Sequence, residues 1–176
     1  DRKKALVSTG NFNSSSLCNP AAKPSTCNRD FSVVSSNPTA VRALSRVFVR
    51  DFNAAAFNFA TYINQDERKL VTISPYAQPD IIEFVNSAKH SITVQAQYLK
   101  EPVLNAALLD AALRGVKVKL TIASMCSFAR PNAAEVARVT QIFEPMETAG
   151  VDIRMFTSLN HVNGANAYMH SKVIFV

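Results

Sequence analysis

The sequence predicts an α/β fold in which a mixed, largely parallel sheet is flanked by helices on both faces. Hydrophobic residues make up 48% of the 176 residues and charged residues 18%, which is typical of an ordered globular chain. From residue 70 onward, strand-like segments alternate with segments of helical periodicity. Such βαβ units build parallel sheets with helices packed against them.

The first third of the chain predicts two strands and one long helix. Asn37 and Pro38 mark the start of this helix, with Asn as the N-cap and Pro in the first turn. Apolar residues then recur at helical spacing. The expected elements are a strand over 4–8, a loop over 13–29, a strand over 30–35 and a helix over 38–62.

The charged segment 64–69 is the best candidate boundary between two parts of the chain. Gly115 and Gly150 end two later helices, because glycine readily takes the left-handed conformation that closes a helix. Pro145 is expected to interrupt the second of these helices. The expected strands cover 70–74, 91–99, 116–123, 151–156 and 168–176, and the expected helices 80–90, 102–114 and 132–149.

Charge and cysteine content narrow the function classes. The net charge of +6 fits an anionic partner such as phosphate, a lipid headgroup or nucleic acid, and fits equally a solvated surface rich in lysine. No apolar run is long enough for a transmembrane helix, and no Cys/His cluster predicts a metal site. Cys18 and Cys27 are close enough in sequence to form a disulfide or to remain free loop thiols. The location stays open, with a secreted, periplasmic or membrane-associated protein favoured.

His170 and Lys172 are the first candidate functional pair. Alternate residues of a strand face the same side, so the imidazole and the ammonium point the same way. An imidazole can attack phosphorus or shuttle protons while the ammonium neutralises phosphate oxygens. A histidine without function at a strand end is the alternative. Because His170 begins its strand, the rule that ligands gather at the carboxyl ends of parallel strands does not place it there.

The two ends of the chain resemble the phospholipase D superfamily, whose signature H-x-K-x4-D-x6-G-S-x-N occurs twice per active site. His170, Ser171 and Lys172, followed by four apolar residues, are similar to the opening of the second copy. Asp1, then six residues, then the segment Ser8-Thr9-Gly10-Asn11 is similar to the close of the first copy. Thr9 stands where serine is usual and Ser8 where glycine is usual.

Segments between the two half-motifs strengthen the resemblance. Residues 29–31 (Arg-Asp-Phe) resemble the acidic strand that follows the first copy. Residues 95–98 and 112–118 resemble the Q-Y strand and the A-x-R-G-V-x-V segment that precede the second copy. The resemblance implies that residues 1–66 are the C-terminal part of a first repeat and 67–176 the N-terminal part of a second. The sequence is then expected to be one piece of a longer polypeptide, inactive by itself.

The resemblance also implies a mechanism without metal or other cofactor. In the family, one histidine attacks the phosphodiester and forms a phosphohistidine, and the other protonates the leaving alcohol. Lysines and asparagines hold the phosphate oxygens. This implies catalytic roles for His170, Lys172, Asn11 and Asp30, with Asp30 orienting the first-copy histidine that would precede residue 1. The motif residue Asp1 is implied to be mainly structural.

Three further residues are candidates for contact with substrate. Thr9 is implied by its place in the motif. His161 precedes the last strand and could line a substrate entrance or be a solvated loop residue. Gln97 could line the cleft or belong to a buried hydrogen-bonded pair with Gln95.

The expected function is phosphodiester hydrolysis or phosphatidyl transfer on phospholipids, with peripheral membrane contact through the Phe-rich helix 38–62. A metal-independent endonuclease acting on nucleic acid is the second choice. A non-catalytic phospholipase D-like module that binds an anionic partner is the third. A serine hydrolase is excluded because no G-x-S-x-G elbow is present, and a P-loop or dinucleotide fold because only four glycines occur.

Overall fold

The computed structural model describes residues 1–18, 27–54, 63–75, 77–125, 132–156 and 168–176. The chain forms two compact units, each described here by itself. Unit 1 consists of Asp1–Val7 and Ser32–Glu83, and unit 2 of Ser8–Phe31 and Phe84–Val176. The predicted division into repeats at residue 66 concerns sequence duplication and stays a prediction.

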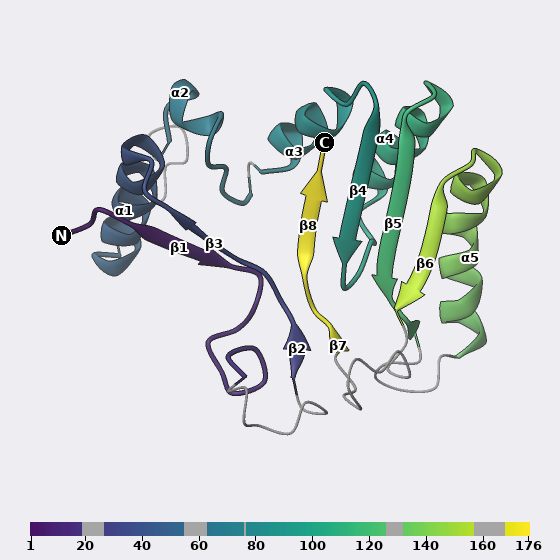
Figure 1. Cartoon of the computed structure of the whole chain (residues 1–176), viewed down its shortest axis with the longest axis horizontal. Coiled ribbons are helices and arrows are strands. Elements are labelled where there is room, and N and C mark those ends of the chain that lie inside the picture. The colour runs from purple at the N-terminus through teal and green to yellow at the C-terminus, as the bar shows by residue number, and fades with distance from the viewer. Residues whose placement is uncertain (19–26, 55–62, 76, 126–131, 157–167) are drawn as a thin grey trace. The chain divides into compact units, whose positions relative to one another are not determined.

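Unit 2 is built on a four-stranded sheet (Figure 1). Its strands lie in the order β6 (Asp152–Phe156), β5 (Lys117–Ala123), β4 (Ser91–Ala96) and β8 (Lys172–Phe175). Strands β4, β5 and β6 are parallel, whereas β8 runs antiparallel to β4. The predicted mixed, largely parallel sheet of an α/β fold is therefore confirmed.

Helices α4 (Pro102–Leu113) and α5 (Ala133–Thr148) flank this sheet and contact each other. Strands β4 and β5 alternate in burial, so that Ile92, Val94 and Leu120 are almost fully enclosed. The hydrophobic period of two thus gives the sheet the apolar face on which the helices pack. Gly115, with φ of +88°, closes the turn after α4, as the sequence predicts.

A second, two-stranded ladder in unit 2 positions the candidate site. Strand β2 (Asn28–Arg29) pairs in parallel with β7 (Tyr168–Met169). The predicted single strand over 168–176 is therefore wrong, because the chain changes partner within it. The amide of His170 donates to the carbonyl of Arg29, and the carbonyl of Ser171 accepts from the amide of Gln97. The segment 168–176 thus contributes to two ladders, and His170 and Ser171 lie between the part that pairs with β2 and the part that pairs with β4.

Unit 1 contains the pair β1 (Ala5–Ser8) and β3 (Ser32–Ser35) together with α1 (Pro38–Phe52), α2 (Gln65–Arg68) and most of α3 (Ala77–Asn86). Asn37 caps α1, since its side chain accepts hydrogen bonds from the amides of Thr39 and Ala40. The predicted continuation of this helix lies partly outside the described residues, and the described helix ends at Phe52. None of the helices in the described part of the chain is long and apolar enough to cross a bilayer.

The predicted strand over 70–74 is wrong. Asn64 and Glu67 form a capping box that starts the short helix α2 inside the charged segment 64–69. The amides of Leu70 and Val71 both donate to the carbonyl of Glu67. These bonds turn the chain back after α2, so the β-branched residues that follow do not extend into a ladder.

The predicted interruption of the last helix is also wrong. Helix α5 runs through Pro145 to Thr148. Proline removes only one donor from the helix, and the carbonyl of Pro145 still accepts from the amide of Ala149 at 3.0 Å. Helix α3 begins at Ala77 rather than at residue 80.

Candidate active site

His170 and Asp30 form a hydrogen-bonded pair within unit 2. Nδ1 of His170 lies 3.0 Å from Oδ1 of Asp30. The side chains are only 16% and 6% exposed, respectively. An ionised carboxylate can only accept, so this bond places the proton on Nδ1 and leaves Nε2 as the nitrogen with a lone pair. The imidazole is thereby fixed in one tautomer and one orientation.

The β2–β7 ladder explains why two residues 140 positions apart meet. Arg29 is opposite Met169 in this parallel pair, and Asp30 and His170 are the next residues of the two strands. The amide of His170 also donates to the carbonyl of Arg29 at 3.1 Å. The backbone register therefore sets the distance between imidazole and carboxylate.

Thr9 also holds Asp30, through the same carboxylate oxygen as His170. The Thr9 hydroxyl donates to Oδ1 of Asp30 at 2.9 Å and accepts from the amide of Phe31 at 3.0 Å. The amide of Thr9 donates to the carbonyl of Phe31 at 2.9 Å. The motif position where serine is usual thus needs a hydroxyl, and Thr9 provides it.

Gly10 permits the chain to approach this carboxylate. A Cβ atom at residue 10 would lie 2.7 Å from Oδ2 of Asp30 and 2.9 Å from Cβ of Ser16. No side chain fits there without displacing Asp30. Ser8, which replaces the usual glycine of the motif, accepts a hydrogen bond from the amide of Gly10 at 3.1 Å.

The charge of Asp30 follows from its surroundings. Burial raises the pKa of its carboxyl, whereas the hydrogen bonds from His170 and Thr9 lower it. The lowering prevails, so the net pKa lies below the usual value of 3.8. Asp30 is accordingly ionised at neutral pH and can stabilise a positively charged imidazole.

Lys172 lies beside the imidazole. Its Nζ is 3.3 Å from Nε2 and 3.4 Å from Nδ1 of His170, and it also donates to the carbonyl of His170. Burial lowers the pKa of Lys172, while the charge of Asp30 opposes that shift. The structure thus brings the ammonium and imidazole to the same side of the strand, as the sequence predicts.

The site lies at the carboxyl end of the parallel strands. Lys172 at the start of β8 is opposite Ala96 at the end of β4, because the two strands are antiparallel. The rule for the carboxyl ends of parallel strands does not place His170 here from the sequence, because His170 begins its strand. The antiparallel direction of β8 brings the start of this strand to the carboxyl end of β4, which removes the mismatch.

The partner of Asp30 also corrects the sequence-based assignment. Asp30 was expected to orient a histidine preceding residue 1, but its carboxylate is bonded to His170. The motif order does not reveal this pairing, since it depends on the parallel register of β2 and β7. The acidic residue after one half-motif thus serves the histidine of the other.

The remaining predicted site residues are placed as follows. Asn11 is exposed in the loop after β1, and among the described residues no side-chain hydrogen bond joins it to the His170–Asp30 pair. Asp1 is exposed in unit 1. Gln97 touches the site through its backbone, by donating to the carbonyl of Ser171 at 2.9 Å. His161 lies outside the described residues.

A disulfide joins Cys18 and Cys27, whose Cα atoms are 5.8 Å apart. The amide of Asn28, directly after the bridge, donates to the carbonyl of Ser15 at 2.7 Å. The side chain of Asn28 donates to the hydroxyl of Ser16 at 3.2 Å. These bonds tie the loop that contains Gly10 and Ser16 to strand β2, which leads into Asp30.

Two supporting residues were not identified as such from the sequence. Gly10 occupies the position of the motif where any residue is allowed, so the motif contains no signal for it. Arg29 was noted only as part of a motif. Its guanidinium carbon lies 4.7 Å from the ring centroid of Phe156 at the end of β6, a cation–π contact that ties the β2–β7 ladder to the four-stranded sheet.

The arrangement suits chemistry at phosphorus. A carboxylate-oriented imidazole can act as nucleophile or proton shuttle, and the neighbouring ammonium can neutralise charge on phosphate oxygens. In the described part of the chain no group of three or more Cys, His, Asp or Glu side chains is arranged to hold a metal ion.

Comparisons with known proteins identify the family and the fold. Residues 81–176 match the family model described as cardiolipin synthase, PLD-like domain. A search of curated proteins gives no match. Among solved structures, polyphosphate kinase from Porphyromonas gingivalis is similar, with a TM-score of 0.50 and 17% identity over 97% of this chain. The match spans 24% of that kinase chain and concerns the fold alone.

Proposed function

Because the chain belongs to the phospholipase D superfamily, as a PLD-like domain of the cardiolipin synthase family, we propose that it acts on phosphodiesters. The proposed reaction is hydrolysis or phosphatidyl transfer on phospholipids through a covalent phosphohistidine. The observation that carries the proposal is the buried Asp30–His170 pair with Lys172 beside the imidazole.

His170 is one of the two histidines that the reaction requires. In the first step the Nε2 lone pair of one histidine forms a bond to phosphorus and the P–O bond to the leaving alcohol breaks. The other histidine gives its proton to that alcohol. In the second step the oxygen of water or of an acceptor alcohol forms a bond to phosphorus, the P–N bond to the first histidine breaks, and the proton of the attacking group returns to the second histidine. The Asp30 carboxylate stabilises the charge on His170 and holds Nδ1 protonated.

Lys172 supports both steps by charge. The pentacoordinate transition state places additional negative charge on the equatorial phosphate oxygens, and a fixed ammonium near the attacked phosphorus stabilises it. Its position beside His170 supports this role. Asn11 is proposed to hold a phosphate oxygen, and Thr9 to hold Asp30 and thereby the imidazole.

The phospholipid is proposed on the strength of the family match, together with peripheral contact with a membrane. The disulfide supports a secreted or periplasmic protein, since such bridges persist in oxidising compartments. The polyphosphate kinase named above is similar in fold only and carries no argument on substrate.

The test is a substitution of His170 in the full-length protein. We expect His170→Ala to lower the turnover of phosphatidylglycerol or phosphatidylcholine by roughly 10³-fold or more, because nucleophile or proton transfer is lost. His90→Ala is the matched control, since His90 is an exposed residue just before β4 and should leave turnover unchanged. Full activity of His170→Ala would contradict the proposal.

A second substrate assay separates chemistry from substrate class. Cleavage of plasmid DNA in excess EDTA that depends on His170, without turnover of phospholipid, would keep the mechanism and overturn the lipid assignment. Absence of both activities in the full-length protein would favour a binding module instead.

A further inference from the structure

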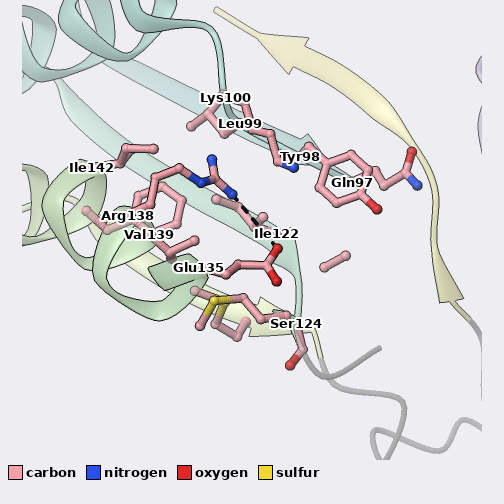
Figure 2. Close-up of a pocket in the computed structure, with 14 residues that line it drawn as sticks. Gln97, Tyr98, Leu99, Lys100, Ile122, Ser124, Glu135, Arg138, Val139 and Ile142 are labelled. Carbon is pink, nitrogen blue, oxygen red and sulfur yellow. Dashed lines mark ion pairs between the residues drawn. The ribbon is translucent and has the colours of Figure 1, made fainter. Parts of the chain in front are cut away.

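A pocket of about 200 Å³ lies at the carboxyl ends of β4, β5 and β6, beneath the first half of α5. Figure 2 shows its walls: Leu99 and Lys100 come from the loop after β4, Ile122 and Ser124 from the end of β5, and Val139 and Ile142 from α5. The proposed mechanism makes no use of this pocket.

Much of the pocket wall is apolar. Aliphatic, aromatic or thioether side chains make up this part: Leu99, Ile122, Val139, Ile142, Phe143 and Met155. Lys100 also lines the pocket, and its Nζ lies over the ring of Tyr98, 4.5 Å from the ring centroid. The charged residues on α5 neutralise each other, since a guanidinium nitrogen of Arg138 lies 3.9 Å from Oε1 of Glu135. Both side chains are about two-fifths exposed, at 41% and 42%. The interior of the pocket therefore favours an uncharged, apolar group.

The pocket adjoins the candidate active site. Gln97 lines it, and the amide of Gln97 donates to the carbonyl of Ser171, the residue between His170 and Lys172. In Figure 2 the Gln97 side chain extends away from the pocket toward the yellow strand β8. The last residue of β4, Ala96, is opposite Lys172. A molecule whose phosphate meets His170 and Lys172 thus has this pocket beside it.

The size of the pocket limits what it can hold. A dry apolar cavity of roughly 150 Å³ takes up one benzene molecule. The volume of about 200 Å³ therefore suits an alkyl segment of a few carbon atoms rather than a headgroup with its hydration shell.

We propose that this pocket binds an alkyl segment of one ester arm of the phosphodiester substrate. The inference rests on the proposed function, because it assumes that phosphate binds at His170 and Lys172. Beyond the proposed function, the inference names the surface that would select a substrate with an apolar arm over one with a small polar arm. This surface is formed by Leu99, Ile122 and the α5 residues Val139 and Ile142.

The four methionines of the chain provide a binding measurement that does not require turnover. Met125 and Met155 line the pocket, whereas Met146 is 2% exposed in the core and does not. With ¹³C-methyl methionine in the full-length protein, hexyl phosphate should shift the Met125 and Met155 signals saturably. Methyl phosphate has the same charged group and no alkyl arm, and should leave them in place. The Met146 signal should not respond to either compound.

A matched pair of variants locates the effect. Val139→Phe fills the pocket and should weaken hexyl phosphate binding at least tenfold. Val136→Phe places the same ring on α5 at a position that is 40% exposed and outside the pocket, and should bind as the wild type does. The comparison of hexyl with methyl phosphate on the wild type needs no variant. It therefore tests whether the pocket binds an alkyl segment even if Val139→Phe does not fold.

Equal responses of Met125 and Met155 to both phosphates, or no response to hexyl phosphate, would overturn the inference. Undiminished binding by folded Val139→Phe would do so too. The proposed function fails by a different result, namely full turnover by His170→Ala. The two failures are therefore distinguishable.

Discussion

Asp30 receives two side-chain hydrogen bonds on one oxygen. The Nδ1 of His170 and the hydroxyl of Thr9 both lie within 3.0 Å of Oδ1. Because the Thr9 hydroxyl also accepts from the amide of Phe31, the group that holds the carboxylate is itself fixed to the backbone. The orientation of the His170 imidazole is thus determined by a residue outside both histidine motifs.

The first prediction at this scale concerns the charge of Asp30. Asp30→Asn keeps the shape of the side chain but removes the charge that stabilises a protonated imidazole and fixes its tautomer. We expect turnover to fall roughly 10²-fold or more, an effect in the range of general acid–base catalysis. Steady-state kinetics of the full-length protein measure it, with circular dichroism to confirm folding. Turnover within twofold of the wild type would show that the pair does not orient the catalytic imidazole.

The lowered pKa of Asp30 also predicts how stability depends on pH. Its pKa in the folded state lies below the usual value of 3.8, so the ionised carboxylate stabilises the fold above that value. This contribution disappears as the pH falls through the folded-state pKa. We expect the difference in free energy of unfolding between wild type and Asp30→Asn to shrink as the pH falls below the usual carboxyl pKa of 3.8 and through the lower pKa of the folded state. Urea denaturation at each pH measures it, and a difference that grows toward low pH would contradict the assignment.

At the scale of elements, the division of the last strand determines the site. Strand β7 pairs with β2 and brings His170 to Asp30, whereas β8 pairs with β4 and brings Lys172 to the carboxyl end of the sheet. The apolar run over residues 173–176 predicts extended backbone correctly. It does not reveal the change of partner, because both ladders require the same side-chain period.

The loop before β2 gives the prediction at this scale. The Cys18–Cys27 bridge closes a loop with a sequence separation of 9, which restricts the unfolded chain. We expect the double variant Cys18→Ser/Cys27→Ser to lose about 2 to 3 kcal/mol of unfolding free energy. Chemical denaturation measures this loss. Cys126→Ser leaves both bridge cysteines in place and is the control, and equal stability of all three proteins would contradict a stabilising bridge.

For the whole molecule, the sequence predicts what depends on local pattern. The alternation of strand-like with helical segments, the N-cap Asn37 and the glycine after α4 lead to the correct α/β fold. The half-motif at the end of the chain leads to His170 and Lys172, and the Arg-Asp-Phe segment at 29–31 leads to Asp30. Two local predictions fail, namely the strand over 70–74 and the interruption of α5 at Pro145. The other differences depend on pairing between distant segments: the antiparallel direction of β8, the partner of Asp30 and the close approach of Gly10. No periodicity in the chain encodes which strands become neighbours.

The central claim is that phosphodiester turnover passes through a phosphohistidine in a site that contains His170. The stereochemical outcome at phosphorus tests it most directly. Two successive in-line displacements each invert the configuration, so a chiral phosphorothioate diester should react with net retention. A single direct attack by water or alcohol gives inversion. The predicted result is retention in the wild type and loss of turnover in His170→Ala. Inversion in the wild type would contradict the account.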